Sequence, residues 1–293
     1  MRYILSILIT TLYFNAFSQN DSLKTDSLKQ ALQIHTQSIE SNANNVNAYI
    51  NRARVKIRLR DYSGSIQDNL RAINLNPNSD TAYTNIGAAY YLLKIYDEAI
   101  KNYNKAIQIN PKMYKAYNFR GDAKQKQLKN KSAIKDFTTA INLNPQYAQA
   151  YYHRAISEEY LQHYKAALQD YNQAIELNPG NGSMHYARAT CRFNLTYYQE
   201  AIEDYSKVIQ LNKADFQAYC SRAHCYARLK QFDLAIQDCN KAIEINPRYD
   251  EAYFRRGNFN LKIGNQTQAC IDWIKAYGLG KEDAKYSMHK YCK

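Results

Sequence analysis

The sequence predicts an all-α fold, a solenoid of stacked antiparallel helix pairs. The segment AINLNP returns with small variations every 34 residues, beginning at residues 72, 106, 140, 174, 208 and 242. Small residues recur at helical spacings within each period, and the period ends in Asn-Pro in every copy but one. A fixed period of about 20–50 residues marks stacked supersecondary units, because one such unit cannot bury its apolar face alone.

The chain begins with the layout of a secretory signal peptide over residues 1–18. Arg2 is followed by an apolar stretch that ends at Phe17, and the small residues Ala16 and Ser18 precede the expected cleavage point. A membrane span needs about 18 or more apolar residues, which this stretch does not reach. We therefore expect export to the periplasm or the extracellular space. An uncleaved N-terminal anchor is the alternative.

The composition is basic, with 39 Lys and Arg against 26 Asp and Glu and a formal net charge of +13. Such a surface can bind nucleic acid, because phosphate neutralisation drives that binding. The predicted export argues against a nucleic-acid partner. Surface glycans, lipids or acidic proteins fit an exported basic chain better, and a solvated Lys-rich surface is the simplest interpretation. No second apolar run in the sequence is long enough to span a membrane, so the mature chain is expected not to cross one.

Placing the proline at position 32 of each period divides residues 46–283 into seven repeats without insertions. Repeats one to seven are 46–79, 80–113, 114–147, 148–181, 182–215, 216–249 and 250–283. Positions 8 and 20 are always Ala, Gly or Ser, and position 27 is Ala or Val. Small residues at these spacings let two helices approach closely, while aromatic residues at positions 17 and 24 fill the gaps.

The second helix of each repeat is expected to end at Ile or Leu, before the Asn of position 31. That Asn is expected to adopt a left-handed conformation, and the following Pro begins the next helix. Residues 19–45 predict a linker and an N-terminal capping helix, with Ala31 at its small position. Residues 284–293 predict a short C-terminal capping helix after a bend at Gly278 and Gly280.

This period and pattern resemble the tetratricopeptide repeat family over residues 46–283. The departures are an Arg at position 7 in six repeats, where the family usually has Leu, and the missing Tyr and Pro of repeat five. The resemblance implies helix pairs stacked into a right-handed superhelix with a concave groove. It implies a non-enzymatic scaffold or adaptor that binds a peptide or protein segment there. The alternative is an envelope protein that holds an acidic glycan or lipid on its basic surface.

Each Arg at position 7 has an Asp sixteen residues later, whereas repeat two has Ile86 and Asn102 instead. The two positions change together, and antiparallel helices bring them side by side, so we predict ion pairs within each repeat. The predicted pairs are Arg52 and Asp68, Arg120 and Asp136, Arg154 and Asp170, Arg188 and Asp204, Arg222 and Asp238, and Arg256 and Asp272.

The six cysteines all lie in the last hundred or so residues, and their spacings match no metal-site template. Most are expected to be small core residues with free thiols. Export permits disulfides, and we predict one between Cys270 and Cys292, because the last helix should lie across repeat seven. The sequence has no HExxH motif, phosphate-binding glycine loop or nucleophile elbow, so we expect no enzyme, no metal and no cofactor.

In the resembled fold, positions 2, 5, 9, 12 and 13 of the first helix line the concave face. Aromatic residues occupy several of these positions, and basic residues outnumber acidic ones around them. The predicted groove residues are Tyr91, Tyr152, Tyr160, Tyr186, Phe193 and Phe254, with Arg54, Arg58, Lys115, Asn118, Lys126, Arg228 and Lys262. Aromatic anchors with cationic neighbours suit a segment that carries apolar and acidic side chains. The alternative is that the rings pack against the next repeat.

Overall fold

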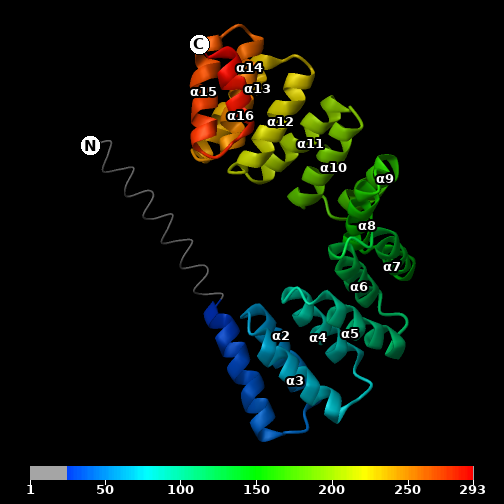
Figure 1. Cartoon of the computed structure of the whole chain (residues 1–293). Coiled ribbons are helices and arrows are strands. Elements are labelled where there is room, and N and C mark those ends of the chain that lie inside the picture. Colours follow the sequence, from blue (N-terminus) through cyan, green and yellow to red (C-terminus); the bar gives the residue numbers. More distant parts are fainter. Residues whose placement is uncertain (1–24, 293) are drawn as a thin grey trace. The chain divides into compact units, whose positions relative to one another are not determined.

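A computed structural model describes residues 25–292, and the predicted signal peptide lies outside these residues. The chain divides into two compact parts, Met1–Asn144 and Pro145–Lys293. Helices joined by short turns make up the described residues of both parts, and none of those residues forms a strand (Figure 1). No helix within residues 25–292 is long and apolar enough to cross a bilayer.

The N-terminal part begins with a helix over residues 25–41, which lies within the predicted N-terminal cap. Three helix pairs follow. They are α2 (Val46–Arg58) with α3 (Tyr62–Leu75), α4 (Asp80–Leu92) with α5 (Tyr96–Ile109), and α6 (Tyr114–Lys126) with α7 (Asn130–Leu143).

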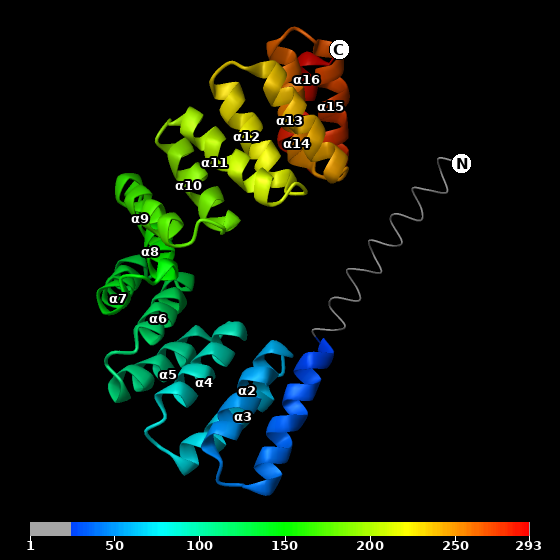
Figure 2. The same ribbon diagram turned by 180° about the vertical axis from the view of Figure 1, so that it is seen from behind.

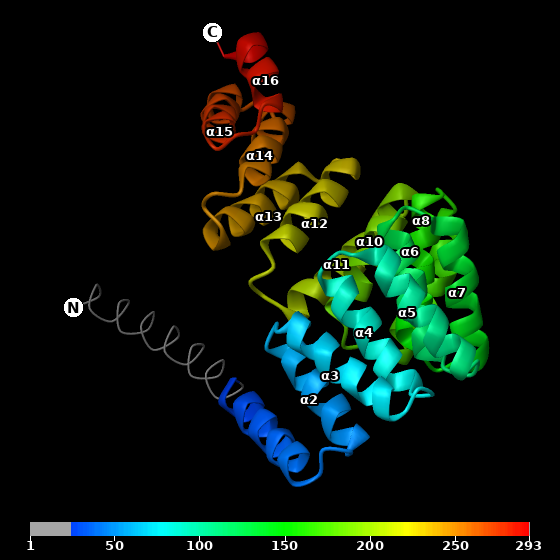
Figure 3. The same cartoon turned by 60° about the horizontal axis from the view of Figure 1, so that its bottom comes forward.

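The C-terminal part holds four helix pairs and one short terminal helix. The pairs are α8 (Ala148–Tyr160) with α9 (Tyr164–Leu177), α10 (Gly182–Asn194) with α11 (Tyr198–Leu211), α12 (Phe216–Arg228) with α13 (Phe232–Ile245), and α14 (Asp250–Lys262) with α15 (Gln266–Gly278). The two helices of a pair lie side by side, as Figure 2 shows for α14 and α15. The last helix, α16 (Asp283–Tyr291), packs on α15 (Figure 3). The first helix of every pair begins at the first residue of a predicted repeat.

The core of each repeat depends on its small residues. A Cβ atom added at Gly87 would lie 2.6 Å from the ring of Tyr103, and one added at Gly257 would lie 2.8 Å from the indole of Trp273. Both rings are almost fully buried. Position 8 must therefore stay small wherever position 24 carries a large ring, because a close-packed interior has no room for both.

The prediction of a left-handed Asn at position 31 is wrong. These Asn residues are extended, as in Asn76 with φ −139° and Asn110 with φ −130°. Pro at the next position favours this extended backbone, but Asn212, which Lys213 follows, is equally extended at φ −140°, so the proline is not required for it. The left-handed residue of each repeat stands instead at position 15, between its two helices. Those residues are Arg60, Lys94, Leu128, Gln162, Thr196, Lys230 and Gly264.

Candidate binding surface

The structure brings each of the six arginines at position 7 to its aspartate at position 23. The Nη2 to Oδ1 distances lie between 2.6 and 2.8 Å, and all six aspartates are buried. In repeat two, Ile86 is buried and Asn102 donates to the backbone oxygen of Glu98. Because every pair joins two helices of one repeat, the pairs fix the register of each helix pair.

The same arginines make contacts that sequence reasoning missed. Nη1 of Arg222 donates to Ser206 at 2.9 Å, and Nη1 of Arg256 donates to Asn240 at 2.6 Å. Each acceptor lies sixteen residues earlier, in the second helix of the preceding repeat. A polar residue sixteen before each Arg was the available signal, since Ile86 instead has Leu70 at that distance.

The six basic residues predicted for the groove are all exposed. They are Arg54, Arg58, Lys115, Lys126, Arg228 and Lys262. The guanidinium of Arg228 lies 5.1 Å from the ring centre of Tyr198 and 6.0 Å from that of Phe193, whereas no such ring contact is found for Lys262 within the described residues. These side chains can contact a ligand.

The predicted aromatic residues differ in exposure. Tyr160 is 62% exposed, whereas the other five rings are half-buried. The hydroxyl of Tyr186 lies 2.8 Å from Ser221 Oγ, in the first helix of repeat six. The ring of Phe193 lies 4.6 Å from that of His224 in the same helix. Tyr186 and Phe193 therefore pack against the next repeat, as the alternative interpretation of the sequence predicted, and each presents only part of its surface.

Asn118 is not a surface residue, which corrects its prediction as a groove residue. It is 1% exposed. The reason is visible at position 5 of repeat two, where buried Thr84 contacts Met113 at the end of the same repeat. Position 5 of repeat two thus points toward the end of its own repeat, and a short side chain there is covered. Only a large residue at this position, such as Tyr152 or Tyr186, reaches the surface.

A cavity of about 540 Å³ lies in the C-terminal part, between α8, α10, α11 and α12. The rings of Tyr152 and Tyr186 line it, and Val208 and Leu211 add apolar wall. Its volume lies within the range of about 300–1,000 Å³ that is typical of ligand sites, and polar and apolar residues share its lining. The structure thus brings two of the predicted groove residues to one concave site.

Glycine and helix-capping residues create this cavity. At position 34, repeats two and six have Met113 and Tyr249, which pack over position 5 of the same repeat. Repeats four and five have Asn181 and Asp215 at position 34, and these side chains cap α10 and α12. Gly182 also removes a side chain where repeat six has Phe216, whose ring lies 4.8 Å from Tyr249. The space beside the two tyrosines therefore stays open.

The polar groups of the cavity lie at the starts of α10 and α12 and at the end of α11. Ser183, Asn212, Asp215 and Gln217 line this side. Burial raises the pKa of Tyr186, its hydrogen bond with Ser221 opposes that rise, and the charge of Asp215 adds to it. The charge of Arg255 opposes the rise, and the Tyr186 phenol keeps its proton at physiological pH.

Buried thiols elsewhere in the C-terminal part are poorly suited to catalysis. Cys191, Cys220, Cys225 and Cys239 are free and buried. Burial raises the pKa of Cys220 to about 11, although the charge of Arg255 opposes the rise. Because the thiolate is the nucleophile, a thiol with such a pKa is unreactive at neutral pH.

Titration of His224 is expected to make the stability of the protein depend on pH. Burial, with help from Arg255 and Arg228, lowers the pKa of His224 from 6.5 to about 4, and Glu251 opposes the shift. Between pH 6.5 and 4 the unfolded chain binds a proton at this residue and the folded chain does not, so stability falls as pH falls. We expect urea midpoints of a His224→Gln variant to fall less over this window than those of the wild type. Equal losses in both proteins would contradict this assignment.

Family models described as tetratricopeptide repeat match residues 81–113, 114–147, 148–181, 182–215, 216–249 and 239–271. Together the matches cover more than half of the chain. The chain belongs to the tetratricopeptide repeat family. No curated protein matches it. Among its described residues, no group of three or more His, Cys, Asp or Glu side chains could hold a metal ion.

Solved structures of tetratricopeptide repeat proteins share this fold. The protein YrrB, described as having an unusual peptide-binding site, is 21% identical with a TM-score of 0.57, over 64% of this chain and 97% of its own. Part of a Cytophaga hutchinsonii repeat protein is 17% identical with a TM-score of 0.65, covering 80% of this chain and 98% of that one. Pseudomonas aeruginosa pilF is 15% identical with a TM-score of 0.65, and the match covers 74% of this chain and 97% of that one. At these identities the likeness shows the fold alone.

Proposed function

We propose that this protein is a non-enzymatic scaffold that binds an extended or helical segment of a partner protein along the first helices of repeats four to seven. The cavity beside Tyr152 and Tyr186 carries the proposal. It receives one anchoring side chain of the segment. A few buried anchors supply most of the binding energy of such interfaces. Peptide binding by YrrB, a protein of the same fold, lends support.

Acidic side chains of the same segment contact the basic residues outside the cavity. Arg228 and Lys262 are exposed on first helices of repeats six and seven. Exposed charges of this kind guide encounter and select partners more than they add affinity. Binding through the cavity should therefore persist at moderate salt. Binding of a polyanionic glycan or lipid to the basic surface should instead collapse, because salt screens exposed charges.

The proposed place of action is outside the cytoplasm. The signal-like N-terminal sequence motivates this part of the proposal, and the disulfide between Cys270 and Cys292 supports it. Disulfides persist mainly in oxidising compartments. Detection of the full-length protein only in the cytoplasm of intact cells would overturn it.

Gly182→Phe tests the binding site by filling the cavity. Phe216 already occupies the equivalent position of repeat six, so a ring is compatible with the start of this helix. Wild-type protein would first select peptides from a random twelve-residue display library. We expect Gly182→Phe to weaken binding of a selected peptide by about 2 kcal/mol or more, because the anchor loses its pocket. Fluorescence polarisation measures the affinity.

Gly182→Ala is the matched control. Its Cβ would lie 3.8 Å from Leu211, an ordinary contact, so most of the cavity stays open. This variant should bind the peptide like the wild type. Undiminished binding by folded Gly182→Phe would show that the segment binds elsewhere. Circular dichroism and a urea titration establish that both variants are folded.

A further inference from the structure

The charged residues that line the cavity indicate the charge of its ligand better than the net charge of the whole chain does. Among the described residues that line it, none is Lys, Arg or His, and Asp215 is the one that carries a charge. The chain as a whole is strongly basic, which by itself suggests an acidic partner. We propose that the cavity takes a basic side chain of the partner segment, arginine or lysine, with Asp215 as its counter-ion. This inference rests on the proposed binding function.

The carboxylate of Asp215 is available to such a side chain. Its Oδ1 accepts a hydrogen bond from the backbone N–H of Ala218 at 2.9 Å. Its Oδ2 has no hydrogen-bond or ion-pair partner within residues 25–292. In this it differs from Asp204, Asp238 and the other aspartates of position 23, which arginines of the protein already neutralise. A charge held at the edge of a cavity with one oxygen unused can bind a cation.

The rest of the lining suits the body of a long basic side chain. Val208 and Leu211 form apolar wall for a methylene stem. Tyr152 and Tyr186 offer partly exposed rings, and a cation placed over an aromatic face is stabilised by the ring quadrupole. This protein makes the same contact internally, where Arg228 lies over Tyr198.

An anionic occupant is the competing possibility, because two helix N-termini meet at the cavity. Free amides there would favour a negative charge. However, Asn181 accepts hydrogen bonds from the amides of Ser183 and Met184, and Asp215 accepts from Ala218. The caps therefore use three of the amides that an anion would need, and the charge of Asp215 would repel an anion.

Asp215→Asn tests the inference without removing the helix cap. Asn181 caps the preceding repeat from the equivalent position, so an Asn is a suitable cap here. The probes are peptides selected from a random twelve-residue library on wild-type protein. We expect one Arg or Lys position in common among them. A second peptide carries norleucine, an apolar residue of similar length, at that position.

The two proteins and the two peptides form a double-mutant cycle measured by fluorescence polarisation. Asp215→Asn should lower the affinity for the basic peptide at least tenfold. Its affinity for the norleucine peptide should stay within threefold of the wild-type value. If the selected peptides share no basic position, or share an acidic one, the inference is wrong and the binding function stands. The inference is also wrong if Asp215→Asn weakens both peptides equally. If wild-type protein enriches no peptide family, both the function and this inference are overturned.

Discussion

Asp238→Asn is expected to destabilise the protein by about 3 kcal/mol, because it leaves a half-buried arginine without its counter-ion. Asp238 accepts from Arg222 Nε and Nη2, both at 2.8 Å, and is 6% exposed. Burial raises the pKa of Asp238, although the hydrogen bond and charge of Arg222 oppose the rise. The hydrogen bond and charge of Asp238 in turn raise the pKa of Arg222 against the effect of burial, so removing Asp238 leaves this cation without its partner. Urea unfolding followed by circular dichroism measures the loss.

Repeat two supplies the control for this prediction. It carries Ile86 and Asn102 at the two positions, so the double substitution Arg222→Ile with Asp238→Asn copies a pair that the protein already contains. The double variant should lose less stability than Asp238→Asn alone, because no charge remains unpaired. If the double variant loses as much stability as the two single variants lose together, the two residues act independently.

Sequence reasoning predicted the helix pairs because both of their determinants are periodic. Small residues at positions 8 and 20 indicate where the two helices of a repeat are in contact. The joint change to Ile86 and Asn102 in repeat two indicates that the side chains of positions 7 and 23 contact each other. The left-handed residue at position 15 could not be found in this way. Six of the seven residues there are not glycine, and Leu128 or Thr196 gives no sign of a positive φ. The turn geometry is set by the two helices that it joins.

The candidate site was only partly predictable for a different reason. Tyr152 and Tyr186 could be chosen from their helical positions, but the cavity beside them depends on side chains that are missing. Gly182 and Asp215 stand where Phe216 and Tyr249 fill the corresponding space in repeat six. Asn118 was placed wrongly because a helical wheel of one helix does not contain the residues that cover it. A missing contact becomes visible only when neighbouring repeats are compared in space.

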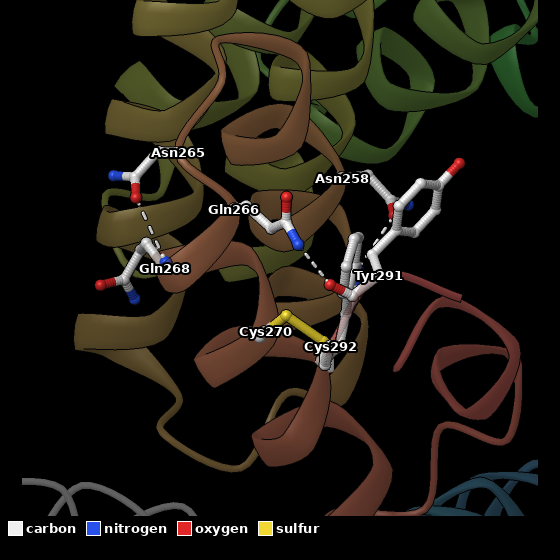
Figure 4. Close-up of a disulfide and its surroundings, with 8 residues drawn as sticks. Asn258, Asn265, Gln266, Gln268, Cys270, Tyr291 and Cys292 are labelled. Carbon is white, nitrogen blue, oxygen red and sulfur yellow. Dashed lines mark hydrogen bonds between the residues drawn. A yellow bond between two sulfur atoms is a disulfide. The ribbon is translucent and has the colours of Figure 1, made fainter. Parts of the chain in front are cut away.

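Loss of the disulfide between Cys270 and Cys292 is expected to release the C-terminal helix. The bond closes a loop with a sequence separation of 22 and joins α15 to the residue after α16 (Figure 4). Other contacts also hold this end: Ala284 and Met288 pack in the cluster around Trp273, the ring of Tyr291 lies 5.8 Å from that of Trp273, and Gln266 donates to the backbone oxygen of Tyr291. A loop of about 15 residues corresponds to about 3 kcal/mol of chain entropy, so α16 should depend on the disulfide for most of its stability.

The Cys292→Ser variant tests this dependence, and hydrogen exchange of the α16 amides is the measurement. We expect these amides to exchange at least tenfold faster than in the oxidised wild type. The helix amides of repeats four to six should keep their protection, because each repeat contacts only its neighbours. Adding reductant should speed exchange in the wild type and leave Cys292→Ser unchanged, since the other four cysteines are already free thiols. If α16 keeps full protection in the reduced wild type, packing of Ala284 and Tyr291 on Trp273 holds the helix without the bond.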